Sequence, residues 1–141
     1  MRMAVSWEDV QRILKQTKTI AVVGLSDKPD RDSYQIASYL QQHGYRIIPV
    51  NPRVNEVLGE KAYPSLRDVP DPVDVVDIFR RSEDVPPIVE DAIAIGAKVV
   101  WMQAGIVNEE AAARAEAAGL GVIMDACMRS AHRTLRASGR I

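Results

Sequence analysis

The chain has 141 residues, of which 47% are hydrophobic and 26% are charged, and its formal net charge at pH 7 is −1. This length and balance predict one globular domain over residues 1–141, with enough apolar chain to form a core. The small net charge and the absence of a long basic run argue against nucleic acid or an anionic membrane as the main partner. The single cysteine, Cys127, excludes an internal disulfide and a multi-cysteine metal site.

Signals for membrane insertion and secretion are also missing from the sequence. No apolar run reaches the roughly 18 residues that a membrane-spanning helix needs. Residues 1–5 lead directly into a helix that Ser6 is expected to cap, so no secretory leader is expected. We therefore expect a cytoplasmic protein with a small-molecule ligand. The sequence leaves open whether it has protein partners or forms a homo-oligomer.

Helical and strand patterns alternate along the chain. Apolar residues at spacings of three and four indicate helices, and short β-branched runs indicate strands. Residues 54–64 are expected to form a loop, and residues 65–69 one helical turn. The expected helices cover residues 7–16, 33–43, 83–95 (capped by Ser82), 109–118 and 128–137, and the expected strands cover residues 19–23, 45–50, 73–79, 98–102 and 122–124.

This alternation predicts the fold class. Strands that alternate with helices imply right-handed crossovers and a parallel sheet. We expect an α/β, Rossmann-like fold, which is a doubly wound parallel five-stranded sheet with helices on both faces. Counted along the chain, its strands are expected in an order such as 3-2-1-4-5.

Such a sheet also predicts where a ligand binds. In open parallel sheets, ligands bind beyond the carboxyl ends of the strands, at the point where the strand order reverses. We therefore expect a site assembled from the loops that follow the strands. Five loops lie at that edge: residues 24–33, 51–53, 79–81, 103–106 and 125–128.

The first of these loops has the features of an anion site. The apolar strand 19–23 is broken at Gly24, and a polar turn precedes the next helix. A glycine lets the backbone approach a ligand closely, and the amino end of a helix offers free N–H groups and a positive dipole. We expect a phosphate to lie over this turn.

A nicotinamide dinucleotide is the obvious ligand for such a fold, but two of its requirements are missing. That ligand needs G-x-G-x-x-G after the first strand and an acidic residue at the end of the second strand. The turn at residues 24–29 has one glycine, and the second strand is followed by Asn51, Pro52 and Arg53. An NAD(P)-type binding module with a degenerate glycine turn is kept as an alternative.

Basic residues instead stand in two separate loops. Lys28 and Arg31 lie in the first loop, and Arg53 lies in the second. Ammonium and guanidinium groups pair directly with phosphate oxygens. This arrangement suits a ligand with two phosphate clusters, and coenzyme A (CoA) carries a pyrophosphate and a separate 3′-phosphate.

Five short motifs occupy the five loops and the strand ends before them. They are Gly24-x-Ser26-x-Lys28-Pro29 with Arg31 and Ser33, then Pro49-Val50-Asn51-Pro52, Val76-Asp77-Ile78-Phe79-Arg80, Trp101-Met102-Gln103-Ala104-Gly105-Ile106 and Met124-Asp125-x-Cys127. In these motifs the chain resembles the small stand-alone CoA-binding proteins. Those proteins are similar in turn to the CoA-binding N-terminal domain of the succinyl-CoA synthetase alpha subunit. The likeness covers about residues 17–135.

The resemblance implies a site for CoA or an acyl-CoA. It implies that the pyrophosphate lies over residues 26–31 and the adenosine near Asn51 and Arg53. It also implies that the pantetheine runs past Phe79 and residues 103–105. The residues implied for cofactor binding are Gly24, Ser26, Asp27, Lys28, Arg31, Ser33, Asn51, Arg53, Phe79, Arg80, Gln103, Gly105 and Cys127.

The chain departs from the synthetase pattern at its carboxyl end. It ends at Ile141 without a second domain to supply a phosphorylated histidine, so ligase activity is not expected to carry over. We expect a non-catalytic binding or accessory module and assign no catalytic or metal-binding residue. An enzyme, or an enzyme subunit, of acyl-CoA chemistry is the alternative.

Some of these residues also have a purely structural interpretation. Gly24 could serve only the turn, and Lys28 could be a solvated charge beside the neighbouring aspartates. Arg53 could be only a surface charge. Arg80 and Arg81 are neighbours on extended chain and point opposite ways, so we expect only one of them to face the ligand.

Cys127 and His132 are the candidates for covalent chemistry. A thiolate at the amino end of a helix is stabilised, and a nearby histidine can deprotonate it. Five helical residues separate the two side chains by about 140° around the axis, so direct pairing is not expected. His132 instead falls on an apolar stripe with Met128 and Leu135. A mixed disulfide between Cys127 and the coenzyme thiol is a further hypothesis, which intact-mass spectrometry tests.

Overall fold

The computed structural model describes residues 6–141, which contain a five-stranded sheet with all strand pairs parallel. Residues 1–5, on which the expectation about a secretory leader rests, lie outside the described residues, although they belong to the predicted domain 1–141. The predicted α/β, Rossmann-like class is confirmed. Among the described residues, no helix combines the length and hydrophobicity that crossing a bilayer requires.

Most elements lie within two residues of their expected bounds. The helices are α1 (Trp7–Gln16), α2 (Asp32–Gln42), α3 (Val85–Ala94), α4 (Glu109–Ala117) and α5 (Met128–Ala137). The main sheet contains β1 (Thr19–Val23), β2 (Arg46–Val50), β5 (Val75–Ile78), β6 (Val99–Met102) and β7 (Gly121–Ile123). A separate hairpin contains β3 (Glu56–Val57) and β4 (Glu60–Lys61), and 3₁₀ turns cover Leu66–Asp68 and Ser82–Asp84.

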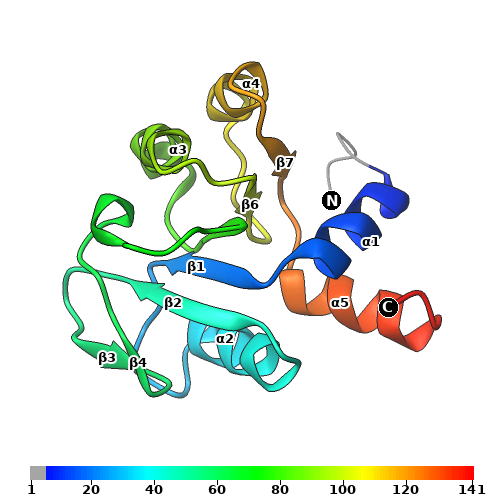
Figure 1. Ribbon diagram of the computed structural model, residues 1–141, viewed down its shortest axis with the longest axis horizontal. Coiled ribbons are helices and arrows are strands. Elements are labelled where there is room, and N and C mark those ends of the chain that lie inside the picture. The colour runs from blue at the N-terminus through cyan, green and yellow to red at the C-terminus, as the bar shows by residue number, and fades with distance from the viewer. Residues whose placement is uncertain (1–5) are drawn as a thin grey trace.

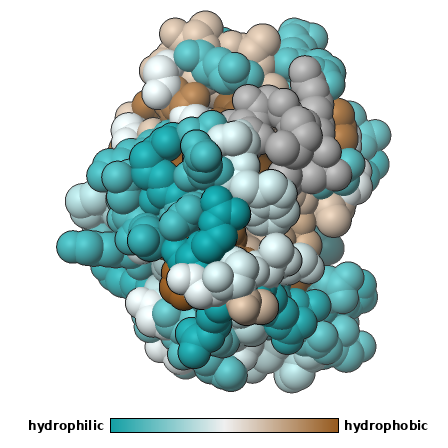
Figure 2. Space-filling model, turned by 90° about the vertical axis from the view of Figure 1, so that its right-hand side faces the viewer, coloured by the Kyte–Doolittle hydropathy of each residue, from teal (hydrophilic) through white to brown (hydrophobic). Residues whose placement is uncertain are grey.

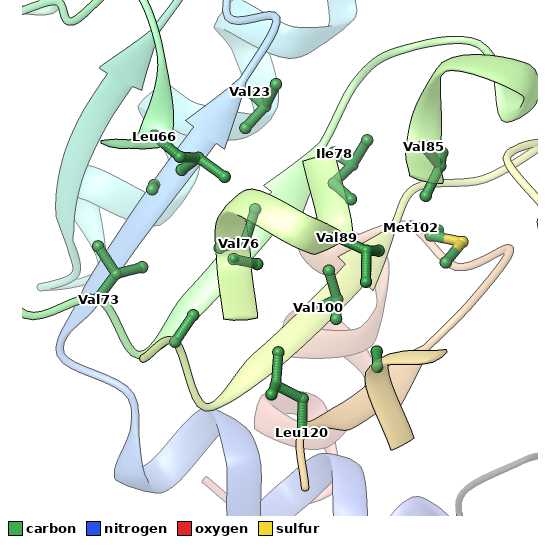
Figure 3. Packing of buried hydrophobic residues seen from close by; sticks show 14 of the residues in the cluster. Val23, Leu66, Val73, Val76, Ile78, Val85, Val89, Val100, Met102 and Leu120 are labelled. Atoms are coloured by element: carbon green, nitrogen blue, oxygen red, sulfur yellow. The ribbon is translucent and has the colours of Figure 1, made fainter. Parts of the chain in front are cut away.

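The helices form two layers, one on each face of the sheet (Figure 1). On one face, Val76 and Val100 of the sheet pack with Val89 of α3 (Figure 3). Their buried cluster also includes Ala111, Ala112 and Ala115 of α4. On the other face, Trp101 belongs to a cluster with Leu40 of α2 and residues of α1 and α5. Both faces of the strands are therefore buried, which explains their nearly continuous apolar sequence. Viewed from the side of α1 and α5, the outer surface is mostly hydrophilic (Figure 2).

The strand order differs from the one expected. The sheet runs β2-β1-β5-β6-β7, which is 2-1-3-4-5 in chain order, and the order 3-2-1-4-5 was wrong. β5 pairs with β1 on one side and with β6 on the other, and all four of its residues are fully buried. The expected order placed this most apolar strand at the edge, where one side would lack a partner. The reversal of strand order therefore lies between β1 and β5.

Pro49 explains why β2 is the edge strand. Proline has no N–H to donate, so within sheets it is confined largely to edges. Pro49 is aligned with Val22 of β1, but its carbonyl faces outward and accepts the N–H of Tyr63 at 3.0 Å. The nitrogen of Pro49 faces the same outer side, where the isolated bridge between Val50 and Tyr63 is the only continuation of the sheet within residues 6–141. Pro49 was therefore a signal in the sequence that β2 is an edge strand.

The loop expected at residues 54–64 contains the β3–β4 hairpin. Its turn consists of Leu58 and Gly59, whose φ angles are 55° and 77°. Two successive positive φ values are typical of the type I′ turn of tight hairpins. Leucine is unusual in such a turn, so the sequence pattern did not indicate the hairpin.

The segment after β5 also begins differently from the expectation. The expected helix starts as a 3₁₀ turn, and α3 itself begins at Val85. Ser82 does not cap α3, because its hydroxyl accepts the N–H of Val107 at 3.0 Å. The expected cap of α1 is confirmed, since Ser6 caps this helix, and Asn108 caps α4.

Gly24 ends β1 at a position that has no room for a side chain. Its φ is +88°, and a Cβ there would lie 2.4 Å from the carbonyl oxygen of Phe79. Its N–H donates to the carbonyl of Val50 at 2.8 Å. Glycine is therefore required where β1 is enclosed between β2 and β5.

We expect Gly24→Ala to lower the free energy of unfolding by more than the ~1–2 kcal/mol that left-handed backbone costs an ordinary residue. The extra loss arises because the end of β5 must also move. Gly44→Ala is the matched control, since Gly44 has a φ of +94° but no atom within 4 Å of its Cβ position. Urea unfolding measures both losses, and equal losses would contradict the steric role of the Phe79 carbonyl.

Candidate functional site

A hollow of about 680 Å³, here called the main hollow, lies where β1 and β2 end and α2 begins. It brings together nine of the thirteen residues expected from the sequence and the resemblance. Sequence reasoning missed three lining residues, Asp30, Asp32 and Val54. The lining consists of Gly24, Ser26, Asp27, Lys28, Asp30, Arg31, Asp32, Ser33, Asn51, Arg53, Val54 and Phe79.

The turn between β1 and α2 is held by its own hydrogen bonds. Ser33 Oγ accepts the N–H of Ser26 at 3.0 Å, and Ser26 Oγ accepts the N–H of Lys28 at 3.1 Å. The N–H of Arg31 then donates to the carbonyl of Lys28 at 3.0 Å. Ser26 and Ser33 therefore fix the shape of the turn in addition to lining the hollow.

The amino end of α2 borders the main hollow without a side-chain cap. Its N-cap residue is Arg31, and no side chain accepts a capping hydrogen bond there. Asp32 and Ser33 of the first turn belong to the lining. The first N–H groups of a helix have no partner inside the helix and carry partial positive charge. An anion in the hollow is able to accept them.

Six charged side chains line the main hollow, and their formal charges cancel. All six are exposed, and none takes part in an ion pair found among residues 6–141. Because the charges in this lining cancel, an anion in the main hollow would depend on local geometry and on backbone N–H groups. The six are Asp27, Asp30, Asp32, Lys28, Arg31 and Arg53.

Asn51 fastens the turn after β1 to the loop after β2. Its Nδ2 donates to the carbonyl of Leu25 at 3.1 Å, and its Oδ1 accepts the N–H of Arg53 at 3.0 Å. The side chain is buried, with 9% of the residue exposed. Asn51 therefore sets the position of the loop that carries Arg53 relative to the turn that carries Lys28.

The remaining loops at this edge are cross-linked in the same way. Asn108 Nδ2 donates to the carbonyl of Ser82 at 2.9 Å, beside the bond between Ser82 Oγ and Val107. Asp125 Oδ1 accepts the N–H of Gly105 at 2.7 Å. Side chains thus connect each loop of the carboxyl edge to a neighbouring loop, which restricts their relative motion.

Four expected binding residues lie outside the lining of the main hollow. Gly105 follows β6, and its N–H is already used by Asp125. Gln103 is 3% exposed, and its Nε2 donates to Asp77 Oδ1 at 2.6 Å. Cys127 is half-buried at the N-cap of α5 and packs against the core cluster of α1, α2 and α5.

Arg80, the fourth of these residues, differs from its neighbour Arg81. The side chain of Arg81 is 75% exposed and pairs with Asp84 at 3.0 Å. Arg80 is half-buried, and its Nε lies 3.2 Å from the position that a Cβ of Gly24 would take. Arg80 thus lies beside the adjacent ends of β1 and β5, while Arg81 faces solvent.

His132 occupies a structural position on α5. It is 5% exposed, its Nδ1 lies 2.8 Å from the hydroxyl of Tyr39, and its ring packs edge-on against His43. Burial, followed by the charges of His43 and Arg136, lowers the pKa of His132. These contacts agree with the apolar stripe expected from the sequence, and no hydrogen bond found among residues 6–141 joins His132 to Cys127.

Asp77 is a buried acid that the sequence reasoning did not interpret. It is fully buried in the central strand β5, and its Oδ2 has no hydrogen-bond partner within residues 6–141. Burial raises the pKa of Asp77 to about 7, and the hydrogen bond from Gln103 acts in the opposite direction. The signal available in the sequence was an acid in the middle of an otherwise apolar strand.

Most of the chain matches a known protein family. Residues 18–133 fit the family model described as CoA binding domain, and this range contains all strands of the main sheet and the loops that follow them. The chain belongs to the CoA-binding domain family. The predicted resemblance to CoA-binding domain proteins is therefore confirmed.

This CoA-binding domain protein is similar to small proteins and to a part of larger ligases. The Bacillus subtilis protein YneT is 48% identical over 124 residues, which is 88% of this chain and 92% of YneT. An ADP-forming acetate–CoA ligase II from Archaeoglobus fulgidus is 33% identical over 107 residues, which is 74% of this chain but 16% of the ligase. A solved structure of a hypothetical protein from Pyrococcus horikoshii OT3 superimposes with a TM-score of 0.91 at 45% identity, covering 94% of each chain.

The raised pKa of Asp77 predicts a pH-dependent contribution to stability. In the unfolded chain the carboxyl ionises near its ordinary pKa of 3.8, whereas in the fold it stays neutral up to about pH 7. The folded state holds the extra proton between these values, so stability falls as the pH rises through this window. The slope contributed by this group is at most about 1.4 kcal/mol per pH unit.

Asp77→Asn removes this contribution. Relative to the wild type, the variant should gain stability between about pH 5 and about pH 7.5, because only the wild type loses the stability that the extra proton on folded Asp77 provides. Urea unfolding of both proteins at the two pH values measures the change. A stability difference that is the same at both would show that Asp77 is not held neutral by burial.

Proposed function

We propose that this chain binds CoA or an acyl-CoA in the main hollow, as a non-catalytic binding or accessory module. The single observation that carries the proposal is that one cavity combines basic residues from two different loops with an uncapped helix amino end. A nucleotide with two separate phosphate clusters is complementary to this arrangement. Membership of the CoA-binding domain family supports the same ligand.

In this proposal the pyrophosphate lies over the turn at residues 26–33. The N–H groups at the start of α2 are its main hydrogen-bond donors, because three aspartates offset the charges of Lys28 and Arg31. Gly24 contributes shape only, since its own N–H is bonded to Val50.

The adenosine and its 3′-phosphate lie at the loop after β2. Arg53 pairs with the 3′-phosphate, and Val54 offers an apolar surface beside it. Asn51 holds this loop in place and has both polar groups of its side chain already bonded. Its role in the proposal is therefore to position Arg53.

The pantetheine leaves the main hollow past Phe79, which belongs to the lining. Further along the edge, the N–H of Gly105 and the Nε2 of Gln103 are bonded to aspartates. The carbonyls of Gln103 and Ile106 also accept backbone N–H groups, so the loop after β6 offers the arm few polar groups.

An enzymatic role shared with a partner chain is the second candidate. The observation in its favour is the 33% identity to part of an ADP-forming acetate–CoA ligase, of which the chain spans 16%. Within this chain, Cys127 and His132 do not form a nucleophile–base pair, which favours the binding role. Turnover of an acyl-CoA that is lost in Cys127→Ala or His132→Ala would favour catalysis instead.

Isothermal titration calorimetry with CoA, acetyl-CoA, NAD and NADP tests the proposed function. We expect CoA and acetyl-CoA to bind more tightly than either dinucleotide, because the hollow lacks an acidic residue for the ribose hydroxyls at the end of β2. Tighter binding of NAD than of CoA would overturn the proposal.

Arg53→Ala should weaken CoA more than dephospho-CoA, which lacks the 3′-phosphate. The expected loss for CoA is on the order of 1.5–3 kcal/mol, the contribution of one charge-assisted hydrogen bond. Arg46→Ala is the matched control, since Arg46 lies at the opposite end of β2 in an exposed pair with Asp71. Equal weakening of both ligands by Arg53→Ala would show that Arg53 does not meet the 3′-phosphate.

A further inference from the structure

A second cavity of about 330 Å³ lies behind the loops of the carboxyl edge. We call it the side cavity. Buried Val23, Val50 and Leu66 supply its apolar floor, and Pro52 and Pro64 also line it. It is formed between the ends of β1 and β2, the 3₁₀ turn after the hairpin, and α3.

Shared lining residues connect the side cavity to the main hollow. Phe79 lines both the main hollow and a shallower depression of about 540 Å³ that also includes Ile106. Arg80 and Asp84 line both this depression and the side cavity. The main hollow, the depression and the side cavity are therefore neighbours, with Phe79 between the first two and Arg80 between the last two.

Arg80 is the unpaired charge between the depression and the side cavity. The two acids that line the side cavity are engaged elsewhere, since Asp84 pairs with Arg81 at 3.0 Å and Asp91 pairs with Arg67 at 2.6 Å. No ion pair or side-chain hydrogen bond found among residues 6–141 includes Arg80, which is half-buried. A half-buried guanidinium without an anion is favourable only if water or a ligand anion satisfies it.

We propose that the side cavity takes the acyl group of a CoA thioester, and that Arg80 selects a short acyl chain that ends in a carboxylate. This inference rests on the proposed function, because the phosphates in the main hollow direct the pantetheine toward Phe79. The apolar floor contacts the methylene groups of the acyl chain, and the terminal carboxylate pairs with Arg80. The ligand class is the CoA thioesters of small dicarboxylic acids.

Binding of CoA, glutaryl-CoA and pentanoyl-CoA tests this proposal by calorimetry. The two thioesters have similar chain lengths, but only glutaryl-CoA has a terminal carboxylate. We expect the wild type to bind glutaryl-CoA about tenfold or more tightly than pentanoyl-CoA, as one charge-assisted hydrogen bond predicts. Equal affinities of the two thioesters would overturn the proposal.

Arg80→Met should lower the affinity for glutaryl-CoA to that for pentanoyl-CoA, since the side chain keeps its length but loses its charge. Arg114→Met is the matched control, because it removes the same charge from the pair with Glu90, away from the side cavity. Weakening of CoA itself by Arg80→Met to the same extent as glutaryl-CoA would place Arg80 on the phosphates and overturn the selection.

Ile88→Trp provides a second test, because Ile88 of α3 lines the side cavity and a larger side chain would fill it. The variant should lower the affinity for glutaryl-CoA to that for CoA and leave CoA binding unchanged. If the variant weakened CoA itself, the side cavity would belong to the nucleotide and the proposal would fail. Failure of the wild type to bind CoA at all would instead contradict the proposed function.

Discussion

The close contact between the end of β1 and the carbonyl oxygen of Phe79 is the constraint on which the rest of this structure depends. No side chain fits at Gly24, where a Cβ would lie 2.4 Å from that oxygen. The contact brings β1 and β5 together where the strand order reverses, which is the place where parallel sheets bind ligands. From this point the chain diverges into the turn toward α2 on one side and into Phe79 and Arg80 on the other. The main hollow opens between these two paths.

The loops around the hollow are held by side chains that do not need a ligand. Asn51 connects the first two loops, Ser82 connects the loops after β5 and β6, and Asp125 connects those after β6 and β7. A site whose loops are already ordered loses less conformational entropy when a ligand binds. The ordering of the loops explains why Asn51, Ser82 and Asp125 form hydrogen bonds with backbone groups. It also separates residues that position the site from residues that are free to contact a ligand.

At the carboxyl edge, the charges available to a ligand depend more on which side chains form ion pairs than on the total charge. The formal charges in the lining of the main hollow cancel, so the amino end of α2 supplies the most directed positive potential. Behind the loops, outer arginines engage Asp84 and Asp91 and leave Arg80 as the available cation. Asp77 lies beneath the same edge with its pKa raised by burial, so it adds little negative charge below neutral pH.

Local patterns in the sequence determined the helices, the strands and the five loops, because hydrophobic period, caps and glycines act over a few residues. They also carried the family resemblance, and nine of the thirteen expected binding residues do share one hollow. Only the tertiary structure decided that β5 lies beside β1, that Gly105 is bonded to Asp125, and that Asn51 reaches a carbonyl 26 residues away. Such contacts depend on which distant segments pack together, and a local pattern contains no information on that choice. The edge position of β2 was partly predictable. Pro49 indicated an edge strand, but only the pairing of β2 with β1 showed that β2 occupies the edge.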